Sequence, residues 1–172
     1  SAGLSAFLIL FFLLKSRKSP LLFSYVWLQS IVLTWSIHVI LLDQTNSWRL
    51  LTVLNYRMRY LFLYYAGFYN ACFIGTAWLL FCLLYAKCPI LRNKTFVLAL
   101  FLPSVILFSI ACISNPVPQL YSLNKHYFIM IVLTQYIDCL TGTTILVRFS
   151  VKQPGYLRIQ SRLLIFAAVI PL

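Results

Sequence analysis

The sequence predicts an all-α fold, a polytopic transmembrane helix bundle, and three observations support this prediction. Of the 172 residues, 62% are hydrophobic and 9% are charged, and the mean hydropathy is +0.92. A soluble domain carries roughly a quarter charged residues, whereas this chain has only two acids, Asp43 and Asp138. Its long apolar runs are separated by short basic clusters. Most of the surface must therefore face lipid.

Four apolar stretches are long enough to cross a bilayer as helices. About 20 residues, at roughly 1.5 Å of rise each, are needed to span about 30 Å of hydrocarbon. None of the four stretches contains a formal charge except Asp138, provided that His38 is neutral. The predicted complete spans are residues 21–42, 60–86, 95–114 and 127–147.

Two further apolar stretches, 1–14 and 163–172, are too short to cross a bilayer alone. We interpret both as partial spans, which makes the chain a fragment cut within two transmembrane helices. The alternative is that both are whole re-entrant or interfacial segments. A signal peptide at 1–14 is disfavoured, because the basic cluster follows this apolar run instead of preceding it.

The basic residues alternate along the chain in a way that predicts its orientation. Ten Lys and Arg residues, with no acid, lie in the connections 15–20, 87–94 and 148–162. Four Lys and Arg residues, with Asp43, lie in the connections 43–59 and 115–126. Cytoplasmic loops retain the excess of positive charge, so we expect the N-terminus outside the cell. Because the cations lie at span ends, the net charge of +12 does not indicate nucleic-acid binding.

Asp138 is the acid that lies inside a predicted span. An ionisable group at that depth costs about 2.5–3.5 kcal/mol and usually faces the bundle interior with a partner. Four polar or small residues surround it at helical spacing, namely Thr134, Gln135, Thr141 and Gly142. We expect this face to point inward, with Asn70 as a candidate partner. Asp138 then either belongs to a ligand pocket or proton relay, or it is a helix-packing residue.

A second polar stripe follows the span 21–42, where Ser30, Thr34 and His38 recur at intervals of four residues. A lone His on such a stripe is more typical of packing than of metal binding. Tyr64, Tyr65, Tyr69 and Tyr127 are expected towards the outer side of their spans, and we interpret most of this cluster as an interfacial aromatic belt.

The sequence contains no recognisable catalytic or metal-binding motif. It lacks paired carboxylates, a Gly-rich phosphate loop, a Ser/His/Asp set and an HExxH motif. Its five cysteines have neither CxxC spacing nor a companion His. We therefore expect no catalytic residue, no metal and no cofactor in this chain.

The order of the segments and the short motifs within them resemble a known family, the N-terminal seven-helix membrane region of bacterial sensor histidine kinases. The same region also precedes diguanylate cyclase domains. The likeness covers nearly the whole chain and depends on the order of weak motifs. These are KSRKSP at 15–20 leading to Trp27 and Trp35, RMRY at 57–60, YYAG at 64–67, LY at 84–85, LPS at 102–104, SN at 114–115, LY at 120–121, and the basic juncture 158–162 before VIPL at 169–172. The chain departs from the family at Gln119, where the family tends to have His.

The resemblance implies a sensory module that detects an extracellular or intramembrane signal and passes it to a cytoplasmic output domain in the same chain. It implies a bacterial plasma membrane location, a homodimer, and a small-molecule or membrane signal as partner besides the lipid bilayer. Candidate ligand-binding residues are His38, Tyr64, Tyr69, Asn70, Tyr127, Gln135 and Asp138.

Two other functions fit the polar residues less well. A small proton-coupled transporter would use Asp138, but it would also favour inverted repeats and paired broken helices. The sequence has one mid-span proline, Pro103, and no evident repeat. An intramembrane enzyme would need several polar catalytic groups at one depth, and the sequence offers Asp138 and little else.

Overall fold

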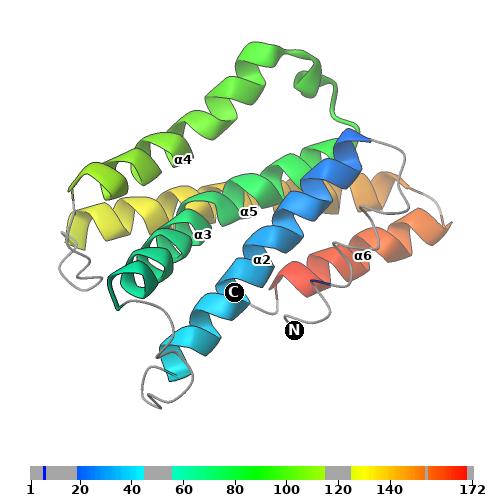
Figure 1. Ribbon diagram of the computed structural model, residues 1–172. Helices are drawn as coiled ribbons and strands as arrows, with labels where there is room; N and C mark the ends of the chain where they lie inside the picture. The colour runs from blue at the N-terminus through cyan, green and yellow to red at the C-terminus, as the bar shows by residue number, and fades with distance from the viewer. Residues whose placement is uncertain (1–5, 7–18, 45–55, 115–124, 154, 170–172) are drawn as a thin grey trace.

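The computed structural model describes residues 6, 19–44, 56–114, 125–153 and 155–169, and these residues form an all-α bundle (Figure 1). No strand occurs within these ranges. The elements are α2 (Pro20–Gln44), α3 (Tyr56–Tyr85), the short 3-10 helix η1 (Pro89–Arg92), α4 (Lys94–Ser114), α5 (Lys125–Lys152) and α6 (Gly155–Val169).

Four of these helices confirm the four predicted spans. By length and apolar composition, membrane-crossing segments lie at Pro20–His38, Tyr65–Tyr85, Lys94–Ile113 and His126–Lys152. The chain is therefore a multi-pass membrane protein with an all-α fold. The expected partial span 1–14 lies outside the described residues, apart from Ala6.

The C-terminal part of the sequence prediction needs a correction. Residues 148–162 were expected to form a loop, but α5 continues to Lys152 and α6 begins at Gly155. Residues 163–169 are therefore the second half of α6 and not a separate short segment. The remaining positions of the predicted partial span, 170–172, lie outside the described residues. Hydropathy identifies only the part of a helix that lies in hydrocarbon. Because Arg158 and Arg162 make the first turns of α6 polar, the hydropathy pattern did not predict a helix there. Gly155 starts this helix with φ of 54°, a value that glycine adopts without steric cost.

Helix α3 is the centre of the bundle and the most buried of the four spans (Figure 1). Residue numbers rise along both helices from one contact between α3 and α5 to the next: Gly75 contacts Gln135, and ten residues further along α3, Tyr85 contacts Phe149. The two helices are therefore parallel. Helix α2 runs the opposite way, since Asn70 meets Thr34 while Phe81 meets Tyr25.

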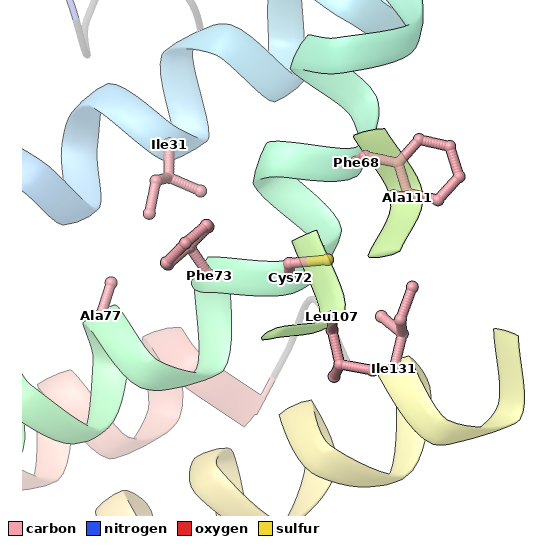
Figure 2. Close-up of a cluster of buried hydrophobic side chains, with 8 residues drawn as sticks. All are labelled: Ile31, Phe68, Cys72, Phe73, Ala77, Leu107, Ala111 and Ile131. Atoms are coloured by element: carbon pink, nitrogen blue, oxygen red, sulfur yellow. The ribbon is translucent and has the colours of Figure 1, made fainter. Parts of the chain in front are cut away.

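Apolar side chains from α2, α3, α4 and α5 form one core cluster around the middle of α3 (Figure 2). Its members are Ile31, Phe68, Cys72, Phe73, Ala77, Leu107, Ala111 and Ile131. Trp27 packs against this cluster, with its ring centroid 6.3 Å from that of Phe73. The cluster fixes the positions of all four spans around the polar groups of α3.

A second apolar cluster lies near the end of α3. Phe81, Cys82 and Leu146 are buried there, and Leu164 and Ile165 of α6 pack against them. The hydroxyl of Tyr85 also donates to Gln160 Oε1 at 3.5 Å. These contacts place the end of α3, the end of α5 and the first turns of α6 at the same end of the molecule.

The outer surfaces of α4 and α5 are apolar, as expected for helices in lipid. Exposed side chains include Leu98, Leu102 and Ile113 on α4 and Met130, Ile137 and Leu140 on α5. In water such a surface would be costly, whereas in hydrocarbon it costs nothing. Burial thus divides each helix into a bundle side and a lipid side.

Candidate functional site

Thr76 connects three helices through its hydroxyl group. The Thr76 side chain is fully buried on α3, and its Oγ1 lies 2.8 Å from Asp138 Oδ2 of α5 and 2.7 Å from Ser104 Oγ of α4. A threonine hydroxyl has one proton to donate. If that proton goes to the Asp138 carboxylate, Ser104 must donate its own proton to Thr76. The result is a directed chain of hydrogen bonds from α4 through α3 to α5.

Gln135 joins α5 to the backbone of α3. The amide N–H of Gly75 donates to Gln135 Oε1 at 2.7 Å, and Gln135 Nε2 donates to the Cys72 carbonyl at 2.8 Å. Both polar ends of the buried Gln135 amide are therefore used. We call Gly75, Thr76, Ser104, Gln135 and Asp138 the α3 polar layer.

Glycine at position 75 is needed for this contact. A Cβ atom built there would lie 2.7 Å from the backbone oxygen of Gln135 and 2.8 Å from its Oε1. Gly142, about two turns after Gln135 on α5, makes a similar approach, since a Cβ there would lie 3.2 Å from Leu79 Cα. Small residues at these two points let α3 and α5 pack closely, as in many membrane helix pairs.

A separate polar contact joins α2 to α3. The Thr34 hydroxyl lies 2.7 Å from Asn70 Oδ1, but it is also within reach of the Ser30 and Ile31 carbonyls of its own helix. Asn70 is 1% exposed, and its Nδ2 has no hydrogen-bond partner. Exchanging the amide oxygen and nitrogen would let Nδ2 donate to Thr34. That exchange only transfers the unsatisfied position to the amide oxygen.

His38 lies one turn beyond Thr34 and is buried against α3. Its ring stacks on that of Trp35, with centroids 5.7 Å apart. A Cβ at Gly67 would lie 2.9 Å from His38 Cε1, so this glycine makes room for the imidazole. Thr34 and His38 thus both face α3, which places two members of the predicted stripe in the α2–α3 interface.

Two of the predicted belt tyrosines make hydrogen bonds inside the bundle. The Tyr69 hydroxyl accepts a bond of 2.8 Å from Trp27 Nε1, and the Tyr127 hydroxyl donates to the Leu107 carbonyl. Both side chains pack against the core cluster. The interpretation of these residues as an interfacial belt is therefore wrong for Tyr69 and Tyr127. Tyr64 lies in α3, and its side chain is outside the described part of the structure.

The expected pairing of Asp138 with Asn70 is also wrong. Asp138 accepts from Thr76, and Asn70 contacts Thr34 on α2. Asn70 and Thr76 are six residues apart on one helix, which turns them about 240° from each other. Residues on such different faces of α3 meet different neighbouring helices.

The predicted polar face of α5 is only half correct. Gln135 and Gly142 point into the bundle, but Thr141 is exposed and Thr134 is half-buried. The hydroxyls of both threonines donate to carbonyls of their own helix, those of Met130 and Ile137. All four residues lie within about 60° of Asp138, two on each side. Because Asp138 is at the edge of the interface, one side faces α3 and the other faces lipid.

Sequence reasoning missed the two hydroxyl residues of the α3 polar layer, Thr76 and Ser104. Neither lies on a polar stripe of its own helix, so periodicity gives no signal for them. Their position in the sequence is a weaker signal, since Thr76 follows Gly75 and Ser104 follows Pro103 at mid-span. A mid-span glycine or proline often marks a place where polar groups are satisfied by a neighbouring helix.

The candidate site residues thus fall into three groups. Gln135 and Asp138 belong to the α3 polar layer. His38 and Asn70 each lie in the α2–α3 interface, beside Gly67 and Thr34 respectively. Tyr69 and Tyr127 pack beside the core cluster. The α3 polar layer combines a carboxyl group, two hydroxyls and an amide, a set that can exchange hydrogen bonds or a proton between helices. No known family model, curated protein or solved structure matches this chain.

Proposed function

We propose that this chain is a membrane-embedded sensory module, the N-terminal input region of a sensor histidine kinase or a similar receptor. One observation carries the proposal beyond the resemblance described above. Thr76 of α3 is hydrogen-bonded at once to Ser104 of α4 and to Asp138 of α5. A change in the position of one helix therefore alters the hydrogen bonds of the other two.

The mechanism would be a shift between two arrangements of the helices. A signal that contacts one arrangement better than the other raises its population by its difference in affinity. Breaking one hydrogen bond in a membrane interior costs about 0.6–1.7 kcal/mol. That is small enough for a ligand or a change in the bilayer to overcome. The α3 polar layer is suited to switch between two sets of partners, because its hydroxyls can donate in either direction.

The proposal includes the location and partners that the resemblance implies. The chain would lie in a bacterial plasma membrane with its N-terminus outside, followed by a cytoplasmic output domain of the same chain, and it would act as a homodimer. The signal would be a small molecule or a property of the membrane. The C-terminal end of α3, which leads into Lys87, and the C-terminal end of α5, which carries Arg148 and Lys152, would then face the cytoplasm.

Reporter fusions test this orientation. Fusions of a cytoplasm-active reporter after Asn93 and after Gln153 should be active, and one after Asn46 should be inactive, because the excess of Lys and Arg stays in the cytoplasm. A periplasm-active reporter at the same three sites is the control and should give the opposite pattern. Activity of the cytoplasmic reporter at Asn46 alone would reverse the topology.

The function itself is tested on the full-length gene product in native membranes. We expect autophosphorylation from ATP, and Asp138→Asn should change its level at least about threefold, since Asn keeps the size but alters the bond to Thr76. Thr141→Val, at an exposed position of the same helix, is the control and should leave phosphorylation unchanged. A full-length protein without a nucleotide-dependent output would overturn the proposal.

A proton-coupled transporter is the second candidate, favoured by the position of Asp138. Its carboxyl group ends a chain of two hydroxyls, one of which follows the mid-span Pro103 of α4. Such a chain could carry a proton between helices. Proton-driven solute uptake into vesicles containing the chain, with loss of that uptake in Asp138→Asn, would favour this function over the sensor.

A further inference from the structure

One end of the bundle carries a group of exposed basic side chains from three connected regions. Contacts of Tyr85 with Gln160 and Phe149 bring the end of α3, the end of α5 and the start of α6 together there. Helix α4 also begins at this end, after η1. We name the cations the basic rim. Its members are Lys87, Arg92, Lys94, Arg148, Lys152 and Arg162, all of them exposed.

The positive charge of the basic rim is not neutralised by the described part of the chain. None of the six cations forms an ion pair with a described residue. Asp138 lies ten residues before Arg148, about 15 Å along α5, and it is bonded to Thr76. Asp43 lies near the other end of α2. Six like charges at one end repel each other unless anions gather among them.

A seventh cation, Arg158, has a different role. Its Nη2 donates to the Val151 carbonyl at 3.1 Å and its Nε to the Ser150 carbonyl at 3.4 Å. These are carbonyls of the last turn of α5, which lack partners within the helix. Arg158 therefore caps α5 and ties α6 to it, and it is not counted in the basic rim.

Exposed aliphatic side chains alternate with the cations of the basic rim. Ile90 is 45% exposed between Lys87 and Arg92, and Val147 and Val151 are 43% and 67% exposed beside Arg148. On α6, Leu163 is 64% exposed next to Arg162. The surface thus offers positive charge and hydrocarbon on residues that are neighbours in the chain, near the ends of the apolar spans.

We propose that the basic rim binds anionic phospholipids, with the phosphate group on the Lys and Arg side chains and the acyl chains along the adjacent aliphatic side chains. A nucleic acid or an acidic protein would leave these aliphatic groups facing polar atoms. An anionic amphiphile satisfies both kinds of surface. Basic residues beside a membrane attract anionic lipids strongly enough for several of them to determine lipid choice.

The experiment measures lipid choice directly. The chain is reconstituted in vesicles, and the relative association of spin-labelled phosphatidylglycerol and phosphatidylcholine is measured by electron paramagnetic resonance. We expect about a fivefold preference for phosphatidylglycerol. The triple variants Lys87→Gln/Arg92→Gln/Lys94→Gln and Arg148→Gln/Lys152→Gln/Arg162→Gln should each lose most of it.

Matched controls separate the rim from net charge and from free phosphate. Arg57→Gln/Arg59→Gln/Lys125→Gln removes three charges at the opposite end and should keep most of the preference, as should Lys87→Arg/Lys94→Arg/Lys152→Arg. About 0.5 M NaCl should weaken the preference in the unmodified chain. About 10 mM inorganic phosphate at constant ionic strength should leave it unchanged.

Three results would overturn the proposal. They are an equal association of both lipids with the unmodified chain, an equal loss in the opposite-end control, and displacement of the lipid by inorganic phosphate. The salt and phosphate measurements need no variant, so the test stands even if a triple variant fails to fold. The result is also independent of the sensory function, because it needs neither an output domain nor a signal.

Discussion

Replacing Gly75 with Ala is expected to destabilise the bundle by about 3 kcal/mol, the upper part of the range for overpacking. A loss of stability would be informative, because in the interior of a helix replacing Gly with Ala ordinarily increases stability by about 1 kcal/mol. At position 75 the new Cβ would lie 2.7 Å from a backbone oxygen of α5. Helices α3 and α5 must then separate, which breaks both bonds of Gln135. Reversible unfolding in mixed detergent micelles measures the change.

Two further variants show whether the contact is the cause. Gly142→Ala should cost less, since its nearest neighbour is the movable Trp78 ring, with Cδ1 3.0 Å from the new Cβ. Gln135→Ala should rescue Gly75→Ala only in part, because the closest atom is the Gln135 backbone oxygen and not its side chain. If Gly75→Ala were as stable as the unmodified chain, the close packing of α3 on α5 would be wrong.

Replacing Thr76 with Val is expected to cost about 1–2 kcal/mol of bundle stability. Valine keeps the shape of threonine but removes the hydroxyl that contacts Ser104 and Asp138. Two polar groups in an apolar interior then lose a partner together. The free energy of unfolding in mixed micelles gives the loss, and the same variant should alter output in the full-length protein.

A double-mutant cycle isolates the bond between Thr76 and Asp138. Combining Thr76→Val with Asp138→Leu should cost less than the sum of the two single changes, because each single change already breaks the same bond. Thr141→Val is the matched control and should change stability by less than about 0.5 kcal/mol, since Thr141 is exposed and bonds to its own helix. Additive effects of the two changes would mean that the hydrogen bond contributes nothing.

The fold class could be predicted from the sequence because a single physical constraint determines it. A run of about 20 uncharged apolar residues has one low-energy form in hydrocarbon, a helix that crosses it. That constraint located α2, α3, α4 and the apolar part of α5. It could not locate the start of α6, where Arg158 and Arg162 interrupt the apolar pattern although the helix continues through them.

The candidate site was less predictable, because it depends on how the helices are rotated against each other. Gln135 and Asp138 were identified from their polarity within an apolar span. Their partners, Gly75 and Thr76, are small residues that are common in membrane helices and carry no signal in a single sequence. The close approach at Gly75 and Gly142 decides which face of α5 meets α3. Hydropathy does not predict this rotation, because it measures polarity and not the space that a side chain needs.

The double anchoring of α5 on α3 has a consequence for how this bundle could deform. Two helices that touch at glycines in two successive places, and are joined by a bidentate amide between them, have little freedom to slide or roll against one another. We expect these two helices to move as one rigid unit. Among the described residues, helix α4 is joined to this pair by two hydrogen bonds, Ser104 with Thr76 and Tyr127 with the Leu107 carbonyl, and neither comes with a close glycine contact. A stimulus would therefore sooner move α4 than slide α5 along α3.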